Sequence, residues 1–149
     1  MRAIPAMGEV MSPLPHSITA SASLAEAATL MEMHTIGHLP VFADGDLIGV
    51  FSLRDLERGR ILGHPLSETD LVVGDLCAGP PWFVDVDDPL DRVLESMATS
   101  RLSAALVLQE GDLAGIFTAF DACRLLATWL QRSSPPVTTG AHVEPWRAV

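Results

Sequence analysis

Apolar residues recur with helical spacing at two places in the chain. The positions i, i+3, i+4 and i+7 hold Leu24, Ala27, Ala28 and Met31 in the first place, and Leu90, Val93, Leu94 and Met97 in the second. This spacing predicts two amphipathic helices, each with one face in a core. Ser23 and Glu26 predict a capping box at the first start. Asp88 and Pro89 predict an N-cap and a first-turn proline at the second.

Shorter segments around these helices have the pattern of strands and turns. In the first half we expect an extended piece at Ile18-Thr19, strands at Leu39–Phe42 and Leu47–Phe51, and a helix from Leu53 to about Arg60. In the second half the same elements are expected at Phe83-Val84, Ala105–Leu108 and Leu113–Phe117, with a helix from Ala119 to about Gln131. Gly45 and Gly111 stand where tight hairpin turns need a positive φ.

The two halves are an internal repeat with an offset of 66 residues. Residues 24–56 align without a gap on residues 90–122, and nine of the 33 pairs are identical. Gly8 and Gly74 also match, as do Pro15 and Pro81, and the acidic Glu9 aligns with Asp75. The pattern therefore predicts an α/β fold of the α+β type, in which two pseudo-symmetric β-α-β-β-α repeats pack as one module.

The repeat also predicts where the chain divides. We expect repeat 1 at residues 1–63, a linker at 64–73, repeat 2 at 74–131 and a flexible tail at 132–149. The tail is rich in Ser, Thr, Pro and Gly and has no hydrophobic period. Its Trp146 is expected to be exposed or lightly docked.

Composition narrows the range of functions. The formal net charge is −10 and there is no lysine, which disfavours nucleic acid and anionic membranes as partners. No apolar run approaches the roughly 20 residues of a membrane span, and no signal-peptide pattern is present. Cys77 and Cys123, far apart in the sequence, are expected to be buried, reduced thiols in a cytoplasmic protein, with a disulfide or metal pair as the alternative.

One motif occurs in both repeats at the end of the predicted hairpin. Gly49-Val50-Phe51-Ser52-Leu53-Arg54-Asp55 aligns with Gly115-Ile116-Phe117-Thr118-Ala119-Phe120-Asp121. Together with the methionine late in each helix, the segment Leu39-Pro40-Val41 and the Gly-Asp turns, this doubled motif resembles a tandem pair of CBS (cystathionine-β-synthase) domains, also called a Bateman module. The arrangement also resembles small stand-alone bacterial CBS-pair proteins. The resemblance covers most of the chain except the tail.

The resemblance implies a ligand site in clefts between the repeats, a homodimer, and no required cofactor. Ligands of the family contain adenosine: AMP, ADP, ATP or S-adenosylmethionine. By resemblance, Asp55 and Asp121 would hold ribose hydroxyls, and Ser52 and Thr118 would contact phosphate. The adenine pocket would be lined near Ile18, Ala20, Leu39, Pro40, Val84, Ala105 and Leu106. Ionised carboxylates and hydroxyls at helix starts suit these roles chemically.

The two copies of the motif differ at one position. Arg54 could neutralise phosphate, whereas Phe120 stands at the matching place in the second copy. We therefore expect unequal clefts, with the one containing Arg54 binding a phosphorylated ligand more tightly.

The same residues allow other interpretations. Ser52 with Asp55, and Thr118 with Asp121, are also helix-capping pairs that stabilise a helix start without any ligand. The alternative function is therefore a ligand-independent dimerisation or protein-interaction module. His34 and His38 have the spacing of a helical metal pair, but the helix is expected to end near His34, so we assign no metal site. No catalytic motif is found and we expect no enzyme activity. A regulatory module acting on an unknown protein partner is the leading hypothesis.

Overall fold

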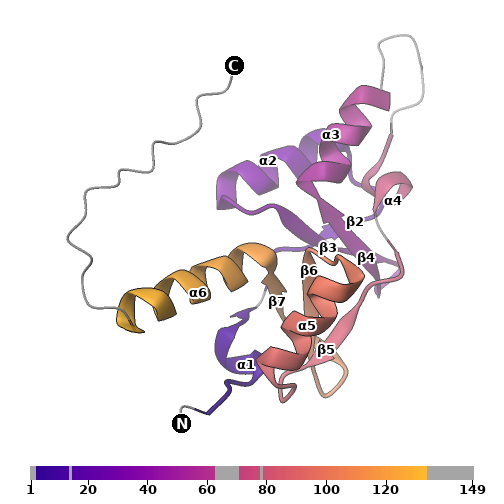
Figure 1. The fold of residues 1–149 in the computed structure, drawn as a ribbon. Helices are drawn as coiled ribbons and strands as arrows, with labels where there is room; N and C mark the ends of the chain where they lie inside the picture. Colours follow the sequence, from indigo (N-terminus) through magenta and orange to yellow (C-terminus); the bar gives the residue numbers. More distant parts are fainter. Residues whose placement is uncertain (1–2, 14, 63–70, 78, 134–149) are drawn as a thin grey trace, which may run out of the picture.

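The computed structural model describes residues 3–13, 15–62, 71–77 and 79–133, and it forms two halves that follow the repeat (Figure 1). The first half of the chain contains α1 (Met7–Val10), β1 (Ser12–Pro13), β2 (Ile18–Thr19), α2 (Leu24–His34), β3 (His38–Ala43), β4 (Asp46–Ser52) and α3 (Leu53–Leu62). The second contains α4 (Val73–Leu76), β5 (Phe83–Asp85), α5 (Leu90–Ser100), β6 (Ala104–Gln109), β7 (Asp112–Thr118) and α6 (Ala119–Ser133). The predicted α/β fold is confirmed.

Each repeat has its own small sheet. β2 pairs in parallel with β3, and β3 pairs antiparallel with β4. In the second sheet β5, β6 and β7 repeat this arrangement, and β1 is added at the edge of β7. Parallel pairing of β2 with β3, and of β5 with β6, requires a crossover, and α2 and α5 supply it. The hairpin turns have positive φ at Asp44 and Gly45 and at Glu110 and Gly111, as the glycine positions predicted.

The predicted start of α2 is confirmed and that of α5 is wrong. The backbone N–H of Glu26 donates to Ser23 Oγ at 3.1 Å, and Glu26 Oε2 accepts from the backbone N–H of Ser23 at 2.7 Å. In α5 the N-cap is Pro89 rather than Asp88. The Asp88 carboxylate accepts a hydrogen bond from the backbone N–H of Asp85 at 2.8 Å, so it stabilises the turn before the helix.

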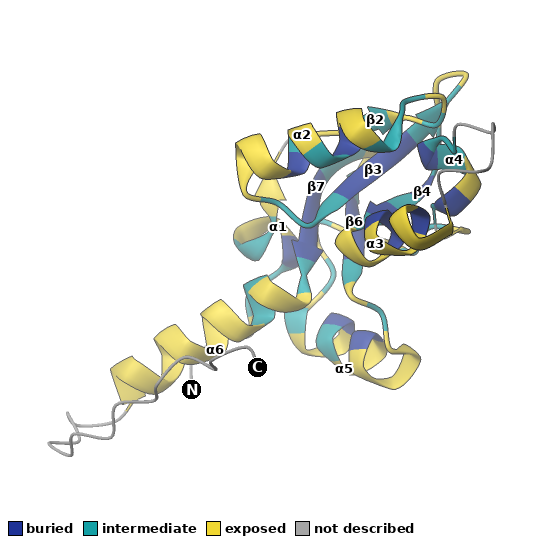
Figure 2. Ribbon diagram, turned by 90° about the horizontal axis from the view of Figure 1, so that it is seen from above, coloured by how far each residue is buried: buried dark blue, intermediate teal, exposed yellow. Residues whose placement is uncertain are grey.

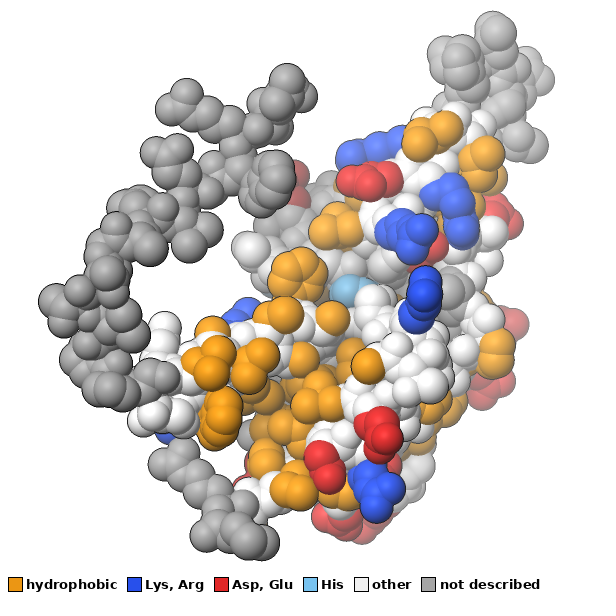
Figure 3. Space-filling model, viewed as in Figure 1, with side chains coloured by type: hydrophobic (Ala, Val, Ile, Leu, Met, Phe, Trp, Pro, Cys, Tyr) orange, Lys and Arg blue, Asp and Glu red, His pale blue; other side chains and the backbone are white. Residues whose placement is uncertain are grey.

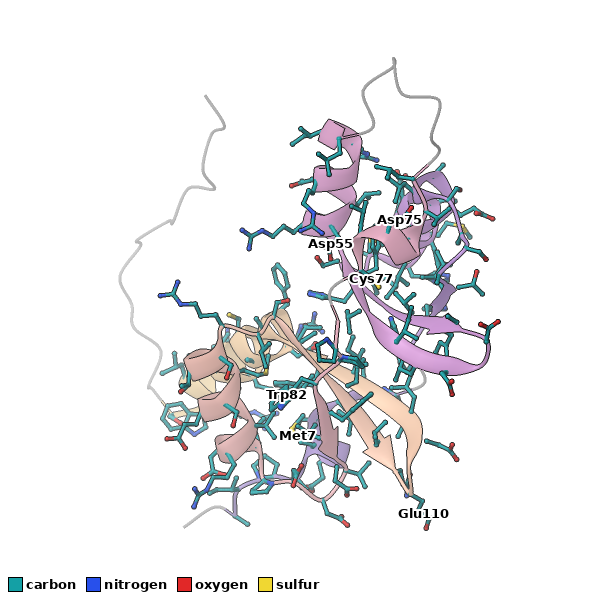
Figure 4. All side chains as sticks on the ribbon, turned by 90° about the vertical axis from the view of Figure 1, so that its right-hand side faces the viewer. Met7, Asp55, Asp75, Cys77, Trp82 and Glu110 are labelled. Atoms are coloured by element: carbon teal, nitrogen blue, oxygen red, sulfur yellow. The ribbon has the colours of Figure 1, made fainter. Side chains whose placement is uncertain are left out.

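The N-terminal segments of the two repeats are exchanged. Backbone N–H groups of Met7 and Gly8 donate to the carbonyls of Asp88 and Val86, which belong to the second half. At the matching positions 66 residues later, Val73 and Gly74 donate to Ala22 and Ala20 of the first half. Figure 4 shows Met7 beside the strands of the second repeat, and Asp75 in the other half near Asp55. A short helix from each half of the sequence therefore docks on the other half, and the second sheet also gains a strand, β1, from the first half.

The exchanged segments each contain a short helix, and these helices account for the alignment of Glu9 with Asp75 upstream of the main repeat. Glu9 Oε2 accepts from the backbone N–H of Ala6 at 2.8 Å, and Asp75 Oδ2 accepts from that of Val72 at 3.0 Å. The aligned acidic residues thus close the first turns of α1 and α4, which the sequence pattern did not predict. A helix of four residues is too short to show a hydrophobic period.

Two hydrophobic cores follow from this exchange (Figure 2). The first contains buried residues of α2, β3, β4, α3 and α4, with Phe51 fully buried. The second contains residues of β5, α5, β6 and β7 around Phe117, together with Met7 from α1. By contrast, α6 has no buried residue, and Figure 2 shows it projecting from the body of the molecule.

Some predictions concern residues that lie outside or at the margins of the described structure. The described residues do not include Gly63 at the end of expected repeat 1, residues 64–70 of the expected linker, or residues 134–149 of the expected tail with Trp146. The closing helices are longer than expected, since α3 extends to Leu62 and α6 to Ser133.

The expectation for the cysteines is wrong in part, because Cys123 is exposed on α6, whereas Cys77 is partly buried.

Candidate functional site

A cleft of about 950 Å³ lies between the two repeats. One side is formed by the end of α2, the segment before β3, and α3, with Met31, Gly37 and Arg60 among the lining residues. The other side is formed by the end of β7 and the first turns of α6, and the segment around β1 closes one end. The volume is within the range of small-molecule sites.

The second copy of the repeated motif lines this cleft. Thr118 and Asp121 stand at the junction of β7 and α6, and both are partly buried. Asp121 Oδ2 accepts from the backbone N–H of Thr118 and from its hydroxyl, both at 2.8 Å. Among the described residues, Asp121 Oδ1 has no hydrogen-bond or ion-pair partner. The predicted cap is therefore present, and one carboxylate oxygen is left for another donor.

The first copy of the motif has the same helix cap, but the second carboxylate oxygen of its aspartate pairs with an arginine. Asp55 Oδ2 accepts from the backbone N–H of Ser52 at 2.9 Å and from its hydroxyl at 2.7 Å. Asp55 Oδ1 lies 3.3 Å from an Nη atom of Arg58, which also donates to the Leu76 carbonyl at 2.9 Å. Asp55 is only 7% exposed, and both of its oxygens are in use. Neither Ser52 nor Asp55 lines the described cleft.

His38 stands where the two repeats meet in the cleft. It begins β3, lies opposite Ser52 in the β3–β4 register, and its Nε2 is 3.0 Å from Ser103 Oγ of the second repeat. Burial lowers the pKa of His38, and the charges of Asp55 and Asp121 act in the opposite direction. A pKa below the ordinary value favours the neutral form of the His38 imidazole. A neutral imidazole offers one donor and one acceptor to neighbouring groups.

The cleft combines apolar and charged surfaces. Phe120 and Leu53 line it although they are 75% and 48% exposed, so large apolar side chains face solvent within it. Its basic residues are Arg60 and Arg124, one from each repeat. Arg54 is exposed on α3, and the structure does not bring it to this cleft.

The expected adenine-pocket residues lie elsewhere. None of Ile18, Ala20, Leu39, Pro40, Val84, Ala105 and Leu106 lines the cleft. Leu39, Val84 and Ala105 are buried members of the two cores, and Ile18 and Ala20 pack against the first. Pro40 and Leu106 are also buried. Because successive side chains of a strand point to opposite faces, Leu39 and Ala105 point into the two cores, whereas Pro40 and Leu106 are buried on the other face of each sheet.

Several cleft residues were not singled out for this site from the sequence. Pro15 and His16 come from the exchanged N-terminal segment, and Thr35 to His38 form the approach to β3. The rings of His16 and His34 are stacked, with centroids 3.5 Å apart. The repeat register contained one usable signal, because Pro15 and Pro81 match just ahead of the first strand of each repeat.

The described residues form neither a metal cluster nor a membrane-spanning helix. In residues 3–13, 15–62, 71–77 and 79–133, no group of three or more His, Cys, Asp or Glu residues is placed to hold a metal ion. His34 ends α2 and His38 begins β3, so they do not share a helix face. In the same part of the chain, no helix is long and apolar enough to cross a membrane.

Curated relatives show similarity over most of the described chain. Hypoxic response protein 1 of Mycobacterium tuberculosis is 31% identical over 106 residues, which are 70% of this chain and 73% of that protein. Inosine-5'-monophosphate dehydrogenase of Thermoplasma acidophilum is 32% identical over 106 residues. The matched region is 71% of this chain but only 20% of that enzyme.

Solved structures have the same fold. A CBS domain pair in complex with 5'-methylthioadenosine and S-adenosyl-L-methionine superposes with a TM-score of 0.75 at 22% identity, covering 85% of this chain and 99% of that one. CBSX2 in complex with AMP gives a TM-score of 0.67 at 25% identity, covering 84% and 98%. The CBS domain family model matches residues 7–60 and 73–128, which are the two repeats. The chain therefore belongs to the CBS domain family and contains a pair of these domains.

Proposed function

We propose that this CBS pair is a non-catalytic regulatory module that binds an adenosine-containing ligand in the cleft between its repeats. The observation that supports this most directly is the arrangement of Asp121: it lines the cleft, and Oδ1 is available beyond the cap. A carboxylate oxygen in this position can accept from ribose hydroxyls, and hydrogen bonds to charged acceptors are the stronger ones. Similar CBS pairs have been solved with AMP and with 5'-methylthioadenosine and S-adenosyl-L-methionine.

Other parts of the cleft suit the remainder of such a ligand. Phe120 offers an exposed aromatic surface at the start of α6, and a purine ring gains from stacking on such a surface. His38 contributes an imidazole ring from the first repeat, next to Ser103 of the second. A ligand that contacts both sides would make the relative position of the repeats depend on its presence, which is what a sensing module requires.

Calorimetric titration with adenosine, AMP, ATP, 5'-methylthioadenosine and S-adenosylmethionine tests this proposal. We expect at least one of them to bind with a Kd in the micromolar range, because the cleft encloses the ligand only in part. Residual adenine absorbance in the purified protein would be an early positive sign. Absence of binding by all five would contradict the proposal.

A homodimer is the second functional proposal, and the surface of α6 favours it. Leu125, Leu126, Trp129 and Leu130 are 37–55% exposed, and their spacing puts them on one side of the helix. Figure 3 shows hydrophobic side chains gathered over α6. A projecting helix with an apolar stripe is poorly stabilised alone. A second copy can cover this stripe, and this would make the module a dimer with or without ligand.

Sedimentation equilibrium checks the dimer. We expect a mass near twice the chain mass of 15.9 kDa. The double change Leu126→Gln and Trp129→Gln should shift the mass toward that of the monomer, because it removes the centre of the stripe. Gln131→Ala, on the opposite side of α6, is the matched control and should leave the dimer unchanged. A monomer at working concentration would contradict this proposal.

A further inference from the structure

The repeated motifs place an arginine three residues after each aspartate, and the two arginines have different environments. Arg58 follows Asp55, and Arg124 follows Asp121. Arg58 is engaged twice, by Asp55 Oδ1 at 3.3 Å and by the Leu76 carbonyl of α4 at 2.9 Å. In the part of the chain that the structure describes, this is the only ion pair, so the Arg124 guanidinium has no acidic partner there.

Arg124 and Arg60 both line the cleft, and neither guanidinium is bonded to another described residue. Arg60 extends from α3 and has no basic counterpart in the other repeat, where Leu126 stands at its matching position. Neither guanidinium makes a hydrogen bond or an ion pair with a described residue. The cleft thus receives one free guanidinium from α3 and one from α6, the matching helices of the two repeats.

We propose that Arg60 and Arg124 select a ligand with several negative charges, and that the cleft prefers a nucleoside polyphosphate over neutral or cationic adenosyl compounds. This rests on the proposed function and names the ligand class within it. Asp121 and Thr118 take the ribose end, and the two arginines take the phosphates. Guanidinium groups match phosphate oxygens in geometry and form strong, charge-assisted hydrogen bonds.

The charge distribution of the whole chain supports this assignment. Asp and Glu outnumber Arg by 19 to 9, so a polyanion is repelled by most of the surface. Within the cleft the charged residues are Arg60, Arg124, Asp121 and Glu32. Asp121 caps the start of α6, and in the proposed arrangement its remaining oxygen binds ribose hydroxyls, so Glu32 is the acidic lining residue that is left without a ligand role. A phosphate chain that reaches both arginines would also connect α3 to α6.

Titration of adenosine, AMP, ATP and S-adenosylmethionine against four single variants tests the assignment. In the wild type we expect ATP to bind about tenfold or more tightly than adenosine, and S-adenosylmethionine to bind more weakly than ATP. Arg60→Met and Arg124→Met should each remove several-fold of the ATP preference and leave the adenosine affinity unchanged. Added salt should weaken ATP binding more than adenosine binding.

Two further variants test whether the effect belongs to Arg60 and Arg124 and not to any arginine of the chain. Arg92→Met, on the exposed side of α5 and outside the cleft, removes the same charge and should change neither affinity. Arg54→Met tests the arginine that the sequence favoured. Equal affinity for adenosine and ATP, tighter binding of S-adenosylmethionine than of ATP, or a loss of ATP preference confined to Arg54→Met would each overturn the assignment while leaving adenosine binding intact. Absence of binding by every ligand would instead overturn the proposed function.

Discussion

Replacing Met7 by Ala is expected to lower the free energy of unfolding by about 2–5 kcal/mol, as for other buried large-to-small changes. Met7 is fully buried in the second core, although it belongs to the first half of the sequence. The truncation would leave a cavity between α1, α5 and the second sheet. It would also weaken the contact that holds the exchanged segment in place. Urea denaturation, followed by circular dichroism, measures the effect.

Matched controls separate this effect from a general intolerance of methionine truncation. Met33→Ala changes an α2 residue that is 71% exposed, and it should alter stability by no more than about 0.5 kcal/mol. Val73→Ala changes the residue that aligns with Met7 and is fully buried in the first core. It should be destabilising as well, by about 1–3 kcal/mol. A neutral Met7→Ala would contradict the exchange of segments.

The exchange also shows where sequence reasoning reached its limit. The register aligned Gly8 with Gly74 and Glu9 with Asp75, so the repetition of these segments could be recognised. The same register holds whether a segment docks on its own repeat or on the other one. Only the backbone hydrogen bonds of Met7 and Val73 to the opposite halves decide between them. The four longer helices and the two hairpins were predictable because their hydrophobic periods and turn residues are local properties.

The candidate site was predictable in part for a similar reason. Thr118 and Asp121 could be identified from the doubled motif, and they line the cleft. The inequality of the two copies was also expected, but from Arg54 and Phe120. The structure adds a different contrast: Arg58 is bonded to Asp55 and to the Leu76 carbonyl, whereas the Arg124 guanidinium has no partner among the described residues. It depends on the Leu76 carbonyl of α4, which sequence spacing alone does not bring next to α3.

Asp121→Asn is expected to weaken adenosyl-ligand binding about tenfold or more, with little change in stability. The amide loses the charge that strengthens hydrogen bonds from ribose hydroxyls, and such bonds contribute about 1.5–3 kcal/mol. Its side-chain oxygen can still accept from the backbone N–H of Thr118, so the start of α6 remains capped. Calorimetric titration with whichever adenosyl ligand binds the wild type most tightly, together with thermal unfolding, measures both properties.

Asp55→Asn is the matched variant, and the opposite pattern is expected for it. Asp55 is buried and bonded to both Ser52 and Arg58, so loss of its charge should lower the free energy of unfolding by about 1–3 kcal/mol. Ligand affinity should change less than threefold, because Asp55 does not line the described cleft. If Asp55→Asn abolished binding while Asp121→Asn did not, the ligand would occupy the first motif. If neither variant changed affinity, both carboxylates would serve only as helix caps, and the regulatory ligand would have to be held by other residues of the module.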